Sequence, residues 1–206
     1  MARKILHIDS SARGRDSDSS ALAQHFLAQW QANHPDDQVI ERDIASNPIP
    51  HLDQTALTGL FSPDEQRTPD MRAAVERVDT LVEEFLAADV LVLGVPMYNF
   101  GIPSTLKAYI DHIAQAGRTF KYTDQGPVGL AGDKQVYVLS TRGGVYENSP
   151  LDHQAAYLRT VFGFLGIDNV HVINAEGLNM GNQVREQAMS QAHAAIEQSV
   201  IRTIAA

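Results

Sequence analysis

The stretch Val90-Leu91-Val92-Leu93-Gly94-Val95-Pro96-Met97-Tyr98-Asn99-Phe100-Gly101-Ile102-Pro103 decides the fold. Its first six residues form an apolar run behind a helical pattern, which predicts a buried central strand of a parallel sheet. The loop that follows holds two prolines, two aromatic rings and an amide side chain. Open α/β sheets bind ligands at the carboxyl ends of their strands, so we expect this stiff loop to lie against a flat ring.

Strand and helix patterns alternate along the rest of the chain. We expect short apolar runs to form strands and segments of helical period to form the helices between them, with Ser19 or Ser20 capping the first helix. The predicted strands cover residues 5–8, 39–44, 90–95, 135–140 and 170–175. The predicted helices cover residues 21–30, 71–88, 104–116, 152–165 and 183–202, with a short helix and exposed loop over 53–68 and a surface excursion over 117–133.

This alternation predicts a parallel sheet with helices on both faces. Five strands in 206 residues fit the flavodoxin-like order 2-1-3-4-5 better than the six-stranded dinucleotide fold. The expected architecture is an α/β, flavodoxin-like three-layer sandwich, formed by one domain over residues 1–206.

Composition excludes several classes of function. The chain has no cysteine, which removes disulfides, thiolate nucleophiles, iron–sulfur clusters and cysteine-type zinc sites. Its net charge of −9 disfavours nucleic-acid binding, which needs a basic surface. No apolar run approaches the roughly 20 residues of a membrane span, and no signal peptide is recognisable, so we expect a cytoplasmic protein without membrane contact. No histidine pair has the helical spacing of metal ligands, so no metal site is expected.

Two further loops follow predicted strands and are expected at the same sheet edge. The loop after residue 8 leads into a helix and holds Ser10, Ser11, Ser17, Asp18 and Ser19. Hydroxyl and free N–H groups at a helix N-terminus bind anions, and ordinary capping explains only one or two of these side chains. The other loop, Thr141-Arg142-Gly143-Gly144, lets a ligand approach the backbone closely because glycine has no side chain.

Together the three loops offer a phosphate site, a planar wall and an approachable backbone. This combination favours flavin mononucleotide (FMN) over an adenine dinucleotide. The dinucleotide fingerprint G-x-G-x-x-G and the triphosphate loop G-x-x-x-x-G-K-[ST] are both absent.

Several segments carry a resemblance to a known family. They are Lys4-Ile5-Leu6-His7-Ile8-Asp9-Ser10-Ser11, Ser17-Asp18-Ser19, Pro96-Met97-Tyr98-Asn99-Phe100, Gly117-Arg118-Thr119-Phe120-Lys121-Tyr122 and Thr141-Arg142-Gly143-Gly144. They resemble the bacterial FMN-dependent NADH-azoreductases, which belong to the NAD(P)H:quinone oxidoreductase group of flavodoxin-like proteins. The resemblance covers essentially the whole length of the chain.

The resemblance implies a homodimer with non-covalent FMN at its interface. It implies ping-pong turnover, in which NADH or NADPH reduces the flavin and leaves before a quinone or azo compound takes two electrons in the same pocket. Flavin N5 carries the hydride, so no catalytic side chain is expected. Backbone N–H groups around Asn99 and Gly143-Gly144 are expected to stabilise the negative charge that develops on the ring.

The site residues that the resemblance implies fall into four groups. They are Ser11, Ser17, Asp18 and Ser19 at the phosphate and ribityl chain; Pro96, Met97, Tyr98, Asn99 and Phe100 along the isoalloxazine ring; Thr141, Arg142, Gly143 and Gly144 at its other edge; and Tyr122 and Phe164 in the substrate pocket. Position 18 is aspartate where some relatives carry an amide, so its backbone N–H is the group expected to serve the phosphate.

Two other functions compete with this hypothesis. A flavodoxin-type electron carrier would bind FMN without a substrate pocket of its own, but the segments 53–68 and 117–133 are expected to cover the ring and shape such a pocket. A phosphate-binding α/β hydrolase would hold no flavin, and the colour of the purified protein separates it from the other two.

Overall fold

The computed structural model describes residues 2–204, and side chains as far as residue 201. Its strands are β1 (Lys4–Asp9), β2 (Gln38–Asp43), β3 (Val90–Pro96), β4 (Phe120–Thr123), β5 (Gly126–Gly129), β6 (Gln135–Thr141) and β7 (Val170–Ala175). Its α-helices are α1 (Asp18–Asn33), α2 (Gln54–Phe61), α3 (Pro69–Ala87), α4 (Ser104–Ile113), α5 (His153–Phe164) and α6 (Asn182–Ile204), with single 3-10 turns at Gly14–Asp16 and Asp64–Gln66.

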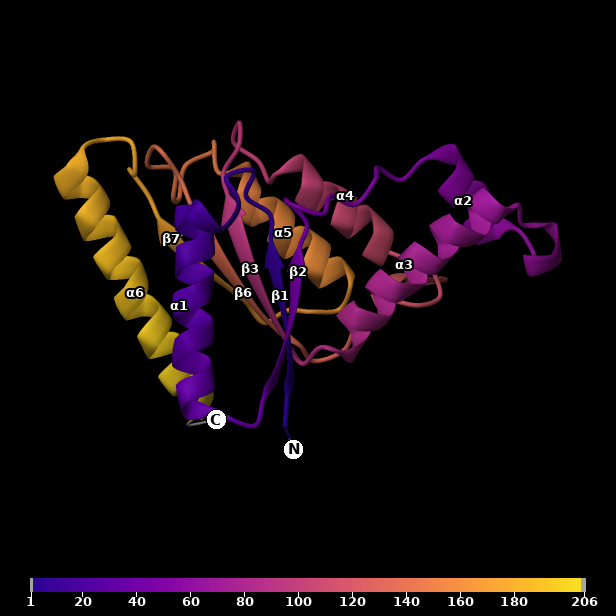
Figure 1. The fold of residues 1–206 in the computed structure, drawn as a ribbon, viewed down its shortest axis with the longest axis horizontal. Coiled ribbons are helices and arrows are strands. Elements are labelled where there is room, and N and C mark those ends of the chain that lie inside the picture. Colours follow the sequence, from indigo (N-terminus) through magenta and orange to yellow (C-terminus); the bar gives the residue numbers. More distant parts are fainter. Residues whose placement is uncertain (1, 205–206) are drawn as a thin grey trace.

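The main sheet is parallel and has the order β2-β1-β3-β6-β7, which confirms the predicted order 2-1-3-4-5 (Figure 1). The order reverses between β1 and β3, which are neighbours in the sheet. At the carboxyl ends of the strands, Asp9 of β1 lies beside Gly94 of β3, and Pro96 of β3 lies beside Thr141 of β6. The loops after these three strands therefore start next to one another.

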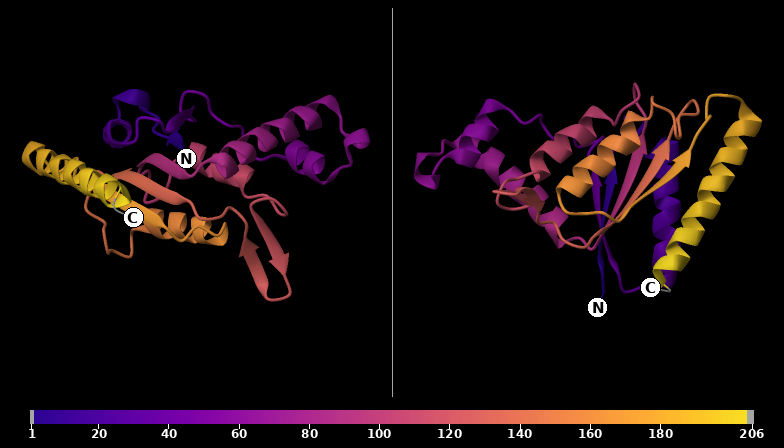
Figure 2. Two further views of the ribbon diagram at one scale, coloured as in Figure 1. Left: turned by 90° about the horizontal axis from the view of Figure 1, so that it is seen from below. Right: turned by 180° about the vertical axis from the view of Figure 1, so that it is seen from behind.

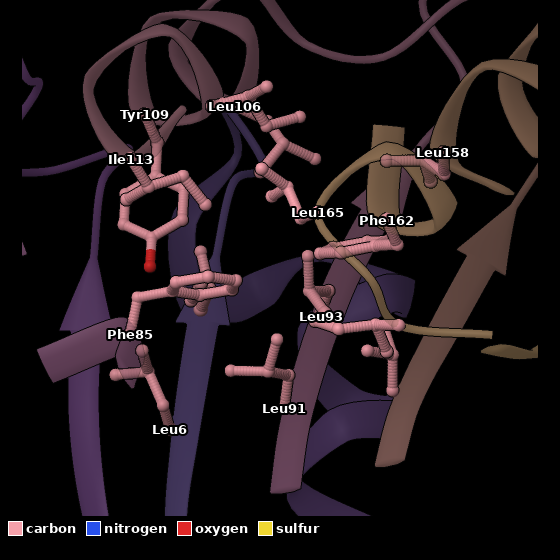
Figure 3. Close-up of a cluster of buried hydrophobic side chains, with 14 of the residues drawn as sticks. Leu6, Phe85, Leu91, Leu93, Leu106, Tyr109, Ile113, Leu158, Phe162 and Leu165 are labelled. Atoms are coloured by element: carbon pink, nitrogen blue, oxygen red, sulfur yellow. The ribbon is translucent and has the colours of Figure 1, made fainter. Parts of the chain in front are cut away.

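Helices cover both faces of the sheet. Helices α1 and α6 pack together on one face, and α3, α4 and α5 cover the other (Figures 1 and 2). Every residue of β3 is buried, and its side chains alternate between the two faces. Leu91 and Leu93 pack under the three-helix layer (Figure 3), whereas Val90 and Val92 face α1 and α6. This two-sided burial explains why the strand reads as a continuous apolar run.

Two helix boundaries differ from the predicted ones. Helix α1 begins at Asp18, three residues before the expected start, because Ser17 and not Ser19 or Ser20 is its cap; the Ser20 N–H donates to the Ser17 Oγ at 3.2 Å. Helix α4 ends at Ile113, before the predicted residue 116, because the chain turns there toward a hairpin.

The two predicted excursions are structured. Residues 53–68 hold α2 and a 3-10 turn, as expected, and α2 packs on α3. Residues 117–133 contain the antiparallel β4–β5 hairpin, which was not predicted and projects from the sheet in Figure 2. None of the helices in residues 2–204 is both long and apolar enough to cross a bilayer.

Candidate functional site

A cavity of about 150 Å³ lies where the loops after β1, β3 and β6 meet. Nine of the predicted site residues line it: Ser11, Ser17, Asp18, Pro96, Met97, Tyr98, Thr141, Arg142 and Gly143. Arg13, Leu178 and Asn179 also line the cavity, and no sequence motif marked them as candidates. The predicted meeting of three loops at one sheet edge is therefore confirmed.

The first wall of the cavity is the N-terminus of α1. Within residues 2–204 the N–H groups of Asp18 and Ser19 have no acceptor, as is normal for the first turn of a helix. Ser19 is fully buried and is not among the lining residues, and its hydroxyl lies 3.3 Å from the Ser17 Oγ, so its side chain does not reach the cavity. Free N–H groups at the positive end of a sixteen-residue helix form an anion site.

Buried contacts hold this helix end against the sheet. The Ser20 Oγ donates to the Asp9 Oδ1 at 2.7 Å, which links α1 to the end of β1. Gly94 of β3 lies against this contact between Asp9 and the start of α1. A Cβ at position 94 would lie 2.8 Å from the Asp9 Oδ1 and 3.2 Å from the Ser19 carbonyl oxygen, so this close approach requires glycine.

The second wall is formed by Pro96, Met97 and Tyr98, which lead into a strained turn after β3 whose central residues do not line this cavity. Tyr98 and Gly101 exchange backbone hydrogen bonds of 3.1 and 3.0 Å around Asn99 and Phe100. Both central residues are left-handed, with φ of 48° and 68°, as in a type I′ turn, where Asn-Gly is the favoured pair. Phenylalanine in this conformation stores backbone strain. Neither central N–H has an acceptor among residues 2–204.

The third wall is the start of the loop after β6, where Gly143 lines the cavity and Gly144, which does not, follows it. Their carbonyl oxygens accept hydrogen bonds from Asn179 N–H at 3.0 Å and Gly177 N–H at 2.9 Å, whereas their own N–H groups donate to nothing in the described part of the chain. Neither glycine has a positive φ, so their backbone conformation does not require glycine. The lack of space for a side chain does. A Cβ on Gly143 would lie 2.5 Å from the Asn179 Nδ2.

The Arg142 side chain is directed to buried carboxylates, so its place in the cavity lining rests on its backbone. Its guanidinium is fully buried and donates to the carboxylates of Asp152 at 2.8 Å and Glu176 at 2.9 Å. Asp152 caps α5, and Glu176 accepts the N–H groups of Tyr146 and Glu147. Arg142 thus holds three segments behind the glycine loop, and only its backbone is available to a ligand.

Comparisons with known proteins agree with this geometry. The model of a family with the flavodoxin-like fold matches residues 3–200. The FMN-dependent NADH:quinone oxidoreductase 2 of Pseudomonas fluorescens strain Pf-5 is 53% identical over 195 residues, which cover 95% of this chain and 98% of that protein. The FMN-dependent NADH:quinone oxidoreductase of Cellvibrio japonicus is 51% identical, with the same coverage. The chain belongs to this family of flavodoxin-like oxidoreductases.

Solved structures support the same family. The azoreductase from Bacillus anthracis strain Sterne superposes with a TM-score of 0.89 at 32% identity, over 97% of this oxidoreductase and 99% of that chain. An FMN-dependent NADH-azoreductase from Bacillus anthracis strain Ames Ancestor, in complex with FMN, gives a TM-score of 0.91 at 27% identity, over 98% and 99% of the two chains.

Tyr122 and Phe164 lie away from the cavity of this oxidoreductase. Both rings contact Phe120, at centroid distances of 5.4 and 4.5 Å, where the hairpin meets the end of α5. Helix α5 begins beside the turn after β3, and Phe164 lies eleven residues further on, about 16 Å along the helix axis. None of residues 117–133 lines this cavity within one chain, so the expectation that they cover the ring stays a prediction.

A second, larger cavity of about 620 Å³ opens on the other side of the turn after β3. Tyr98 and Asn99 line it together with Lys107, His153 and Tyr157. Hydrogen bonding to Asp111 raises the pKa of the Lys107 ammonium, and burial raises the pKa of the Tyr157 hydroxyl. Both groups therefore keep their protons at neutral pH, and the cavity presents proton donors to a ligand.

Replacing Phe100 with glycine separates backbone strain from the function of the ring. We expect the free energy of unfolding of Phe100→Gly to be at most about 1 kcal/mol below that of the wild type, or above it. The relief of backbone strain in the folded state offsets the larger conformational entropy that glycine gives the unfolded chain. The loss of the half-exposed ring is expected to raise the KM for a quinone several-fold. Urea unfolding and steady-state kinetics measure the two effects, with Phe100→Leu as the control that keeps the left-handed strain. A loss of stability above about 2 kcal/mol in Phe100→Gly would show that the turn is not strained.

Proposed function

We propose that this chain transfers electrons from NADH or NADPH to quinones and azo compounds with bound FMN. The observation that carries the proposal is the convergence of unpaired backbone N–H groups from three loops at one edge of the sheet. Bound FMN supplies the redox chemistry, taking a hydride from the nicotinamide and giving two electrons to the acceptor. The family membership of the chain supports the same assignment.

The chain's own residues bind and orient the cofactor. The N–H groups of Asp18 and Ser19, with the hydroxyls of Ser11 and Ser17, bind the phosphate and ribityl chain. The loop after β3 forms the wall along the ring, made by Pro96, Met97, Tyr98, Asn99 and Phe100. Both groups line the 150 Å³ cavity, and they meet where the Ala12 N–H donates to the Tyr98 hydroxyl at 3.1 Å.

The backbone beyond β6 serves the polar edge of the ring. The free N–H groups of Gly143 and Gly144 would donate to the polar edge of a bound ring and would stabilise negative charge on it, and Thr141 and Arg142 hold the start of this loop in place. Such preorganised donors stabilise charge without rearranging during the reaction. No side chain has to exchange a proton in the hydride transfer itself, and water supplies the protons that the acceptor takes up.

We further propose that the working form is a homodimer. A cavity of about 150 Å³ is smaller than the roughly 300–1,000 Å³ of ordinary ligand sites, so one chain leaves the ring uncovered. Tyr122 is 74% exposed on the hairpin. The hairpin of a second copy, with Tyr122 and Phe164, covers the ring and completes the substrate pocket. Sedimentation equilibrium that returned the mass of one chain would contradict this arrangement. We place the enzyme in the cytoplasm, where NADH is abundant.

Initial rates measured at several NADH and quinone concentrations are expected to give parallel double-reciprocal lines. The chain carries no dinucleotide fingerprint that would hold NADH while the acceptor binds. Both substrates therefore use the same exposed ring face in turn. Intersecting lines would indicate a ternary complex and would contradict the single shared site.

A further inference from the structure

The proposed phosphate site contains a carboxylate. Asp18 lines the cavity, and its side chain keeps 19% of its surface exposed. It is also the first residue of α1, so its carboxylate stands beside the free N–H groups assigned to the phosphate. Two negative groups this close repel each other, and an unpaired Asp18 would weaken the binding of a phosphate monoester.

Arg185 of α6 neutralises the Asp18 carboxylate and so removes this repulsion. Its Nη1 donates to the Asp18 Oδ2 at 3.0 Å, and its Nη2 donates to the Asp18 Oδ1. The two hydrogen bonds form the forked pair that arginine makes with a carboxylate, which is stronger and better oriented than a single contact. The pair connects the first turns of α1 and α6, which pack side by side on one face of the sheet.

The local charge depends on this pair. Arg13 also lines the cavity, and among the described residues its side chain has no carboxylate partner. With Asp18 neutralised, the cavity keeps the positive charge of Arg13; without Arg185, the Asp18 charge would cancel it. The whole chain carries a net charge of −9, so the rest of the surface does not attract a doubly charged phosphate.

We propose that Arg185 sets the affinity of this chain for the cofactor phosphate by neutralising Asp18, without touching the cofactor itself. Arg185 is a positioning residue in this account. The proposal rests on the FMN site proposed above and adds to it the residue that makes an aspartate acceptable at position 18. Arg185 affects the binding of the cofactor's phosphate and not the binding of its ring.

Titration of flavin into the flavin-free protein, followed by fluorescence quenching, tests the proposal. FMN and riboflavin are compared in the wild type, Arg185→Gln, Asp18→Asn and the double variant, with Arg185→Lys as the variant that keeps the charge. For FMN we expect Arg185→Gln to raise the Kd about tenfold or more, and Asp18→Asn to lower it about threefold. The double variant is expected within about threefold of the wild type, and Arg185→Lys between the wild type and Arg185→Gln. Riboflavin, which lacks the phosphate, is expected to bind all variants about equally.

Three results in the variants would overturn the inference. They are an unchanged Kd for FMN in Arg185→Gln, an equal loss of FMN and riboflavin in that variant, and a double variant as weak as Arg185→Gln. The second result would show that Arg185 supports only the fold of the α1–α6 contact. A wild-type protein that binds riboflavin and FMN equally well would remove the phosphate site and this inference with it. A wild-type protein that binds neither flavin would instead overturn the proposed function, so the two failures can be distinguished.

Discussion

A valine at position 143 is expected to raise the Kd for FMN by about 100-fold or more while the chain still folds. The new Cβ would lie 2.5 Å from the Asn179 Nδ2, so Asn179 must move, and the methyl groups would stand against the free N–H groups of the loop. The fold is expected to survive because Gly143 has no positive φ and the first atom that it meets is the end of a side chain. A 100-fold change corresponds to about 2.7 kcal/mol of binding free energy.

Flavin titration and urea unfolding of the same sample separate binding from stability in this variant. Gly163→Val is the matched control, since a Cβ there meets only the Asp168 Oδ1 at 4.0 Å and the residue is remote from the cavity. If Gly143→Val folds and keeps its full complement of flavin, the loop after β6 does not contact the cofactor.

Replacing Arg142 with methionine is expected to lower the free energy of unfolding by about 3–5 kcal/mol. Methionine keeps much of the length of the side chain but leaves the carboxylates of Asp152 and Glu176, only 11% and 12% exposed, without their shared cation. Unpaired carboxylates at such sites are costly because burial disfavours their charge. Chemical denaturation at neutral pH measures the change.

An exposed arginine provides the comparison for Arg142. Arg118 pairs with Asp79 on the surface, where the two side chains are 33% and 46% exposed, and Arg118→Met is expected to cost less than about 1 kcal/mol. Adding Glu176→Gln to Arg142→Met is expected to restore part of the lost stability, because one buried charge is removed. Equal losses in the two methionine variants would mean that the Arg142 cluster does not brace the loops.

The order of the strands was predictable because it follows from short-range patterns. The apolar run over residues 90–95 reveals a strand covered on both faces, and strict alternation with helices leaves few topologies for a parallel sheet. The same alternation brings the loops after β1, β3 and β6 to one edge. This is why the sequence located most of the cavity lining, including Ser11, Tyr98 and Gly143.

The roles of particular side chains were less predictable because they depend on distant partners. Arg142 precedes two glycines in a loop at the sheet edge, so the sequence suggests that it contacts a ligand. The orientation of its side chain is instead set by Asp152 and Glu176, which lie 10 and 34 positions away in the sequence. The partner of Asp18 is 167 positions away. No local pattern marks either contact.

Phe164 shows a different limit of prediction from the sequence. Helix α5 places this residue at the helix end remote from the cavity, whereas the family resemblance implies a place in the substrate pocket. Both statements hold only if a second chain brings its own Phe164 and Tyr122 to the ring. One chain read alone contains no signal for that contact.

The flavin content of the purified protein tests the central claim most directly. We expect a yellow protein that releases about one FMN per chain on denaturation and that, before denaturation, oxidises NADH when a quinone is added. The prediction follows from the unpaired N–H groups that the three loops present together. A colourless protein that also fails to take up added FMN would contradict it.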